Sequence, residues 1–496
     1  MFIWSGACPE LFLYCSNEPI HNPGSCRILN TQMNRKFRVA IIGAGISGLS
    51  AAYFLKKKSV DEGLDVDLNI VERSSRPGGV IRTEVVQDFL LEWGPDSFVA
   101  YRPQTRKLIK ELGLEDELIG SKDELRRTFI LRNSQLESLP RNMGFFIPVR
   151  LSSLWSSPSI STSGKLRALL EPFVRPSRGD LSVQEFLVRR LGKELTENIA
   201  GPLVAAIHGG NIQQLSAVSV LPELHRMEQK YGSLWQGIRA FDKHRPTSSR
   251  SLFLTMRHGM SQLIEGLVKE LSHVSLHCSV EDTRLLERAG TYQVKGNQFD
   301  QNFDLVVLSA PATSVANVLS AMNREAADIL SQIPYSSTTL VYLAYSRREF
   351  SHPLDGFGFI VPKKERTRID ACSWVSSKFS GRCPKDQVLL RCTLRQAPGE
   401  ARQPESREHI IDATHQEIQR TLNISCRPTF ASSVHIEQAT PQLNVGHQLR
   451  IGQVDLALKR HPGVLLCGAF FGSGIPQCIE TARLTALRAV EVLKSL

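Results

Sequence analysis

The sequence lacks any apolar run long enough to cross a lipid bilayer. Its longest apolar stretches, such as 304–312, are far shorter than the roughly 18 to 20 residues that a transmembrane helix requires. Cysteine is scarce, with 10 in 496 residues, and no pair has the C-x-x-C spacing. A disulfide scaffold and a cysteine zinc site are therefore poorly supported, and buried free thiols in a reducing cytoplasm are the simpler interpretation.

Motifs that would assign other chemistry are also missing. No H-E-x-x-H surrounds His273 and His277, and there is no G-x-S-x-G elbow or obvious carboxylate pair. Zinc-finger, basic-region and RNA-recognition motifs are absent, which argues against nucleic acid as a partner. The net charge of +11 is spread along the chain, and it favours an anionic ligand, an acidic membrane face or solubility alone.

The composition is otherwise that of a globular protein. Hydrophobic residues make up 42% and charged residues 22%, which excludes a disordered, collagen-like or coiled-coil chain. The segment 1–36 begins apolar but lacks the basic region and small-residue cleavage site of a secretory signal. We expect 1–36 to be a leader outside the fold, with translation starting at Met33 as an alternative.

The first motif that carries chemistry is a glycine-rich turn. A β-branched apolar strand leads into GAGISG at 43–48, and a helix is predicted to start at Ser47. In this motif Gly43 permits a tight turn, Gly45 lets the backbone approach a pyrophosphate, and Gly48 lets the helix pack on the strand. We count Ser47 with these glycines among the cofactor-binding residues.

A second predicted strand, 66–71, ends in Glu72, where an acid can accept hydrogen bonds from the ribose of an adenosine. Strand, helix and acid together predict a dinucleotide site, and a glycine-rich turn without a ligand is the alternative.

The residues after the acid distinguish between cofactors. The stretch 72–83, ERSSRPGGVIRT, resembles the E-x-x-x-R-x-G-G-x-x-x-T stretch of flavoproteins of the amine oxidase and phytoene desaturase superfamily. The resemblance implies FAD in place of NAD. It also implies that Arg76, Gly78 and Gly79 lie along the pyrophosphate and ribityl chain, with Arg73 beside them, since close backbone approach needs glycine and phosphate attracts arginine.

A second glycine-rich turn lies near the C-terminus. A predicted strand ends at Gly468, and Gly474-Ile475-Pro476 precedes a helix predicted over 477–493. Alone, this is consistent with an ordinary turn; paired with the first motif, it indicates the distal wall of a flavin cavity. The superfamily resemblance further implies that the backbone around Val280 faces the adenine.

Five further sequence segments give a more specific resemblance, to the protoporphyrinogen/coproporphyrinogen oxidase family. The match runs from about residue 37 to the C-terminus, and it implies FAD-dependent oxidation of a porphyrinogen to the porphyrin in heme biosynthesis. Hydride would pass to the flavin, and O2 would reoxidise it to give H2O2. The segments are LEWGPDSF at 91–98, LVAAIHGGN at 203–211, YGSL at 231–234, GFGFIVP at 356–362 and GIPQCI at 474–479.

The sequence departs from the family pattern in two places. Ile436 and Leu443 stand where the family often has aromatic residues, and 395–398 replaces commonly found glycines. A flavin amine oxidase, a carotenoid desaturase or a non-catalytic binding protein on the same fold remain alternatives. The substrate is coproporphyrinogen III or protoporphyrinogen IX, which differ by two carboxylates, and the basic charge balance favours the more acidic coproporphyrinogen III.

These observations predict an α/β protein with a Rossmann-like FAD-binding domain built from discontinuous segments. The domain comprises 37–104, 252–313 and 434–496, with a helical insert at 105–251 and a mixed-sheet substrate domain at 314–433. Within the FAD domain, strands at 252–256, 274–280 and 304–309 are expected to join one parallel sheet.

Two segments are candidates for external contacts. Arg102 resembles a basic residue that lies near a substrate propionate in bacterial members of the family, and its guanidinium can grip a carboxylate bidentately. A solvated arginine is the alternative, with Arg106 as the nearest competitor. Apolar residues at 145–148, beside Arg141 and Arg150, could contact an acidic membrane peripherally, although a buried core or a channel wall is favoured. The FAD is expected to be non-covalent, and homodimer formation is left open.

Overall fold

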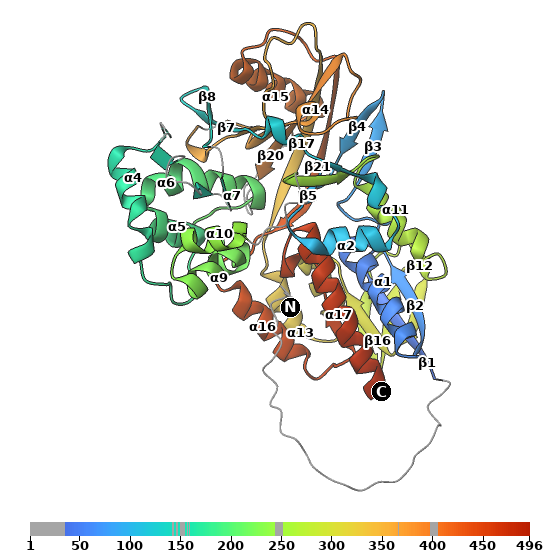
Figure 1. Ribbon diagram of the computed structural model, residues 1–496. Coiled ribbons are helices and arrows are strands. Elements are labelled where there is room, and N and C mark those ends of the chain that lie inside the picture. The colour runs from blue at the N-terminus through green and yellow to red at the C-terminus, as the bar shows by residue number, and fades with distance from the viewer. Residues whose placement is uncertain are drawn as a thin grey trace.

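The computed structural model describes residues 35–140, 143–144, 147–148, 154–155, 157, 159–243, 251–365, 367–396 and 405–496. Figure 1 shows three regions: a parallel sheet with its helices near the C-terminus, a mixed sheet above it, and a helical region to one side. The predicted α/β class is confirmed. Of the helices in the described ranges, none is both long and apolar enough to cross a membrane.

A five-stranded parallel sheet forms the first region. Its strand order is β12-β2-β1-β16-β22, and every neighbouring pair is parallel. Such a sheet is covered on both faces, which explains its nearly continuous apolar strands. The strands are β1 (Lys36–Ile42), β2 (Asp65–Val71), β12 (Ser275–His277), β16 (Leu305–Leu308) and β22 (Val464–Leu466).

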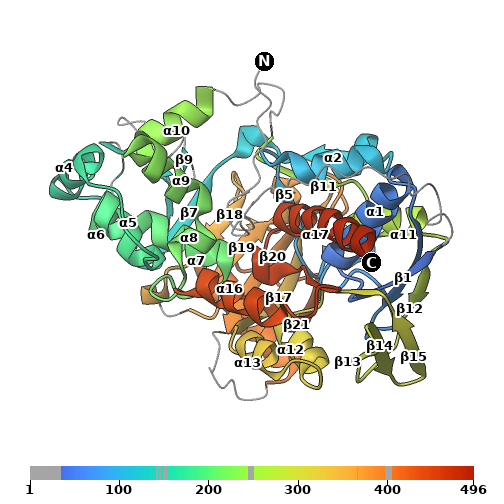
Figure 2. The same cartoon turned by 90° about the horizontal axis from the view of Figure 1, so that it is seen from below.

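Alternate residues of β1 enter two separate cores. Val39 and Ile41 pack with α1 (Ile46–Asp61) and α17 (Ile475–Ser495) on one face. Ala40 and Ile42 pack with helices on the other face, which are α12 (Ala312–Leu319), α13 (Arg324–Ser331) and α16 (His447–Leu458). Figure 2 shows α12 and α13 on the opposite side of the sheet from α1 and α17.

One expectation for this sheet is wrong. The predicted strand at 252–256 exists as β11 (Phe253–Met256), but it pairs antiparallel with β5 (Phe98–Val99) and β6 (Leu118–Gly120) in a separate small sheet. Its apolar sequence resembles that of a buried parallel strand because the strand packs against the helix-covered core, where Met256 is fully buried. Periodicity identified the strand but not its partners.

The connection from β12 to β16 is not helical. It is an antiparallel meander of β13 (Arg284–Arg288), β14 (Thr291–Gly296) and β15 (Phe299–Phe303). Leu285, Val294 and Phe303 from this meander are buried against the parallel sheet.

The mixed sheet has seven strands in the order β21-β17-β20-β19-β18-β7-β8, of which only the pair β18 and β7 is parallel. The predicted strands at 339–345, 358–361 and 388–393 are confirmed within it. Helix α15 (Arg407–Leu422) covers one face. The bounds are β17 (Tyr335–Ser346), β20 (Gln387–Gln396), β21 (Phe430–Pro441), β19 (Ala371–Trp374), β18 (Gly358–Ile360), β7 (Thr128–Arg132) and β8 (Gln135–Ser138).

The region 105–251 is mainly helical, although it also contributes β7 and β8 to the mixed sheet. Its helices include α4 (Thr162–Leu169), α5 (Val183–Leu191), α7 (Gly201–His208), α9 (Pro222–Tyr231) and α10 (Leu234–Lys243). The domain boundaries themselves stay predictions.

Candidate active site

The glycine-rich turn joins β1 to α1 with the geometry that its sequence requires. Gly43 has a φ of +107°, and its amide donates to the Val71 carbonyl at 2.8 Å. A Cβ on Gly48 would overlap the carbonyl oxygen of Gly43, so only glycine lets α1 approach β1 this closely. The helix starts at Ile46, one residue before the predicted Ser47.

The start of α1 is open to an anionic ligand. Gly45 is the N-cap residue, no side chain caps the helix, and its first turn contains no acidic residue. A Cβ on Gly45 would have nothing within 4 Å, which leaves room for a group to approach the backbone. A helix start with free amide donors and no competing carboxylate fits a pyrophosphate.

Glu72 lies at the end of β2, directly beside this turn. One carboxylate oxygen accepts from the Ala44 amide at 2.7 Å and the other from the Ser74 amide at 2.8 Å. Only 9% of the residue is exposed. The Val280 amide donates to the Glu72 carbonyl at 3.0 Å, so the structure brings the two predicted adenosine-binding positions together.

The stretch 72–83 closes over the glycine-rich turn. The Gly78 amide donates to the Ala44 carbonyl at 2.8 Å, and a Cβ on Gly79 would lie 3.3 Å from the Gly45 Cα. Arg76 donates to the carbonyls of Pro77, Gly79 and Ile81, and burial lowers the pKa of its guanidinium. Arg76 therefore shapes the loop, and both Arg73 and Arg76 are exposed.

The C-terminal motif reaches the same edge of the sheet. Strand β22 runs parallel to β16 and β1, Gly468 follows it with a φ of +145°, and Gly474 is the N-cap of α17. Ile475 and Pro476 form the first turn of that helix, which packs against α1 (Figure 1). Both helix starts therefore lie at the carboxyl edge of one parallel sheet, where α/β folds bind ligands. The predicted residues present a consistent cradle for a flavin dinucleotide.

Arg102 lies where three regions of the chain meet. It forms an ion pair with Glu223 of α9. With the Gln477 amide turned so that its oxygen faces Arg102, that oxygen accepts from Nη1 at 2.9 Å and from Nη2 at 3.1 Å. Only 18% of the Arg102 side chain is exposed, so it is not the solvated arginine of the alternative interpretation. Arg106 is more exposed, at 46%.

Sequence reasoning missed His208 and Arg395, and His208 lies close enough to both Arg102 and Arg395 for their charges to act on it. Burial, Arg395 and Arg102 lower the pKa of His208 to about 4, which keeps this imidazole neutral at physiological pH. Arg395 lies on β20 and donates through Nη1 to the Ala205 carbonyl of α7 at 3.0 Å. Only the shared strand face of Arg391 and Arg395, which are four residues and so two strand periods apart, could have indicated a basic pair.

Two further carboxylates, Asp96 and Glu92, lie in the segment 91–98 that carries part of the family resemblance. The Lys378 ammonium lies 3.0 Å from the Asp96 carboxylate; although burial opposes ionisation, Lys378 and Arg391 hold the pKa of Asp96 below its usual range. Burial raises the pKa of Glu92 to about 7, against hydrogen bonds from the Met260 amide and the Thr83 hydroxyl.

The predicted membrane contact at 145–148, with Arg141 and Arg150, lies for the most part outside the described residues. Ile147, which is described, is fully buried.

Comparisons with known proteins match nearly the whole chain. A family model described as flavin containing amine oxidoreductase matches residues 46–494. The chain is 31% identical to the coproporphyrinogen III oxidase of Bacillus subtilis over 93% of this chain and 99% of that protein. It is 25% identical to the chloroplastic/mitochondrial protoporphyrinogen oxidase 2 of Arabidopsis thaliana, over 87% and 89% of the two chains.

Solved structures are also similar to this chain over most of its length. A protein from Exiguobacterium sp. 255-15, assigned as a protoporphyrinogen oxidase, superimposes with a TM-score of 0.80 at 27% identity, covering 93% of this chain and 100% of that one. A reduced UDP-galactopyranose mutase has a TM-score of 0.67 at 13% identity, a likeness of fold alone.

Proposed function

The chain belongs to the family of flavin containing amine oxidoreductases, and from that membership we propose that it oxidises a porphyrinogen to the porphyrin with O2 as electron acceptor. The observation that carries the proposal is the 31% identity to a coproporphyrinogen III oxidase over 99% of that protein's length. The family match also confirms the resemblance and the FAD cofactor expected from the sequence. The protein is thus an oxidoreductase of heme biosynthesis.

When bound, the flavin supplies the redox chemistry, by accepting a hydride from the macrocycle and passing its electrons to O2. The chain's own residues hold and orient the cofactor. The turn 43–48 and the start of α1 receive the pyrophosphate, with Glu72 beside the ribose and the loop 76–79 closing over the turn. Gly474 and the start of α17 face the distal part of the cofactor. This division of labour needs orientation and electrostatics more than a dedicated acid–base pair.

Coproporphyrinogen III is the substrate that the site favours. Three curated relatives named coproporphyrinogen III oxidases are 28 to 31% identical, whereas those named protoporphyrinogen oxidases are 24 to 26% identical. Coproporphyrinogen III has two more carboxylates than protoporphyrinogen IX, and two cations, Arg102 and Arg395, lie within electrostatic reach of the same residue, His208. A guanidinium has five N–H donors, so Arg102 can keep Glu223 and Gln477 as partners and still donate to a propionate.

Steady-state rates on the two porphyrinogens, with a primary amine as a third substrate, test this assignment. We expect porphyrin fluorescence to appear from coproporphyrinogen III at a kcat/KM at least several-fold above that for protoporphyrinogen IX. Turnover of the amine alone would identify a flavin amine oxidase and contradict the proposal.

The protein is proposed to act in the cytoplasm, with any membrane contact peripheral. The described cysteines are all free thiols. Leu166, Leu170 and Phe173 project from α4 and the turn after it at helical spacing, and Phe173 is 84% exposed. Lys165 and Arg175 flank this apolar face, and such a surface suits an anionic bilayer. A high-salt wash should release membrane-bound protein; release by detergent alone would contradict peripheral contact.

A further inference from the structure

Two arginines project from the same face of the mixed sheet. In β20, Cys392 and Leu394 enter the core under α15. Arg391 and Arg395 therefore point to the opposite face, because neighbouring strand residues alternate. Arg391 is opposite Tyr342 in the register, and Tyr342 packs against Trp93 from the flavin-binding part of the chain.

Arg395 reaches from this face to the end of α7. Its Nη1 donates to the Ala205 carbonyl at 3.0 Å, and a Cβ on Gly209 would lie 2.9 Å from its Nε. Burial lowers the pKa of His208, the last residue of α7, and both Arg395 and Arg102 are near enough for their charges to lower it further. The Arg395 guanidinium thus connects β20 of the mixed sheet to the end of α7, close enough to His208 for its charge to act there.

Within the described residues, no ion pair joins the Arg395 guanidinium to an acidic side chain. The ion pairs found there include none to Arg395, and Glu223 is engaged by Arg102 and Arg226. Asp370 accepts from the backbone amide of Arg395 at 2.6 Å, not from its guanidinium. Burial and the nearby Arg391 lower the pKa of Arg395 to about 10, although Asp370 opposes this. Apart from the charge of Asp370, with which the guanidinium forms no ion pair, this sheltered cation lacks the counter-charge that buried charges normally have.

We propose that Arg395 binds a carboxylate of the porphyrinogen and contributes to selection of the more acidic macrocycle. This inference rests on the proposed function. The guanidinium has donors beyond the one used by Ala205, so it can hold a carboxylate while staying fixed to α7. Without Arg395 the substrate keeps its hydride-donating geometry at the flavin but loses one anchor, so the effect belongs in KM and in binding.

Binding of coproporphyrin III, the stable product with the same carboxylates, tests the proposal by fluorescence titration. Because Arg395→Gln removes a charged hydrogen bond to the ligand, we expect it to raise the Kd for coproporphyrin III about 10- to 150-fold. Arg395→Lys should fall between that variant and the wild type, because it keeps the charge without the planar fork. Arg348→Gln is the control: Arg348 is exposed just beyond β17, at the opposite end of the β17–β20 pair.

Flavin content and steady-state kinetics separate the outcomes. The proposal predicts unchanged flavin content in Arg395→Gln, a raised KM for coproporphyrinogen III and a nearly unchanged kcat. An unchanged Kd and KM, or equal losses of flavin and binding in both Arg395 variants, would overturn it and leave Arg395 as a cap of α7. A wild-type protein that neither binds coproporphyrin III nor oxidises its porphyrinogen would instead contradict the proposed function.

Discussion

At the residue scale, Gly45 is the position in the proposed cofactor site where a substitution should affect flavin binding most. The space beside it is empty of protein atoms, so Gly45→Val should fold but occupy the volume that the pyrophosphate needs. We expect the purified variant to contain less than about a tenth of the wild-type flavin, measured by absorbance after denaturation. Gly452→Val on α16, where a Cβ also has open space, serves as the matched control. Full flavin content in Gly45→Val would show that the turn does not hold the cofactor.

Denaturation also tests the non-covalent link. All of the wild-type flavin should appear in the supernatant after precipitation of the protein, and flavin retained in the pellet would refute this expectation.

Glu92 should make stability depend on pH. Burial raises its folded-state pKa to about 7 from an ordinary 4.5, so the folded protein holds a proton that the unfolded chain has released. The free energy of unfolding should therefore fall as pH rises from about 4.5 to 7, by about 3 kcal/mol from this group, and stay level above that. Urea unfolding at pH 5 and pH 8 should show a smaller decrease for Glu92→Gln than for the wild type. Equal decreases in the two proteins would assign the dependence to other groups.

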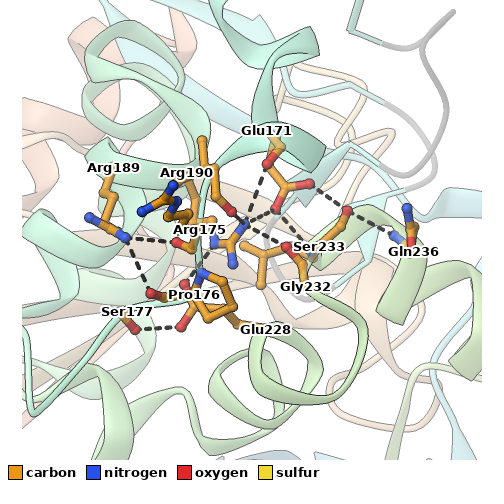
Figure 3. Close-up of polar contacts among 12 residues, drawn as sticks. Glu171, Arg175, Pro176, Ser177, Arg189, Arg190, Glu228, Gly232, Ser233 and Gln236 are labelled. Atoms are coloured by element: carbon orange, nitrogen blue, oxygen red, sulfur yellow. Dashed lines mark hydrogen bonds and ion pairs between the residues drawn. The ribbon is translucent and has the colours of Figure 1, made fainter.

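At the scale of elements, a buried ion network holds the helical region together (Figure 3). Arg190 of α5 contacts Glu171 at 3.1 Å and Glu228 of α9 at 2.7 Å, and all three side chains are fully buried. Ser233 and the Leu234 amide complete the hydrogen bonds of Glu171. Removing the Arg190 guanidinium would leave two buried carboxylates without their shared cation.

Arg190→Met should therefore cost about 3 to 5 kcal/mol of stability, which denaturant unfolding can measure. Lys193→Met, at a side chain that is 77% exposed, should cost less than about 0.5 kcal/mol. Similar losses in both variants would show that the network adds nothing to stability.

Elements defined by local sequence could be predicted, and those defined by distant partners could not. The turn 43–48 and α1 follow from adjacent residues, because glycine spacing and apolar periodicity act within a few turns of chain. Strand β11 was recognised as a strand, but its antiparallel partners lie more than a hundred residues earlier in the chain. For the same reason Arg102 was singled out, whereas its partners Glu223 and Gln477, on distant helices, were not.

At the scale of the whole molecule, we propose that the parallel sheet supplies the flavin cradle and that the mixed sheet and helical region supply the surroundings of the substrate. The Arg102–Glu223 ion pair and the Arg395–Ala205 hydrogen bond connect these regions at one place. Ligand sites commonly lie where such regions meet. The chemistry therefore depends on the assembly of segments that are far apart in the sequence.

Anaerobic reduction of the bound flavin tests the central claim most directly. Purified protein is mixed with coproporphyrinogen III without oxygen, and the flavin absorbance near 450 nm is followed together with porphyrin fluorescence. If the protein oxidises porphyrinogens, we expect rapid bleaching of the flavin. Its colour should recover, with release of H2O2, when oxygen is admitted. A flavin that stays oxidised with both coproporphyrinogen III and protoporphyrinogen IX, yet bleaches with a primary amine, would contradict the central claim.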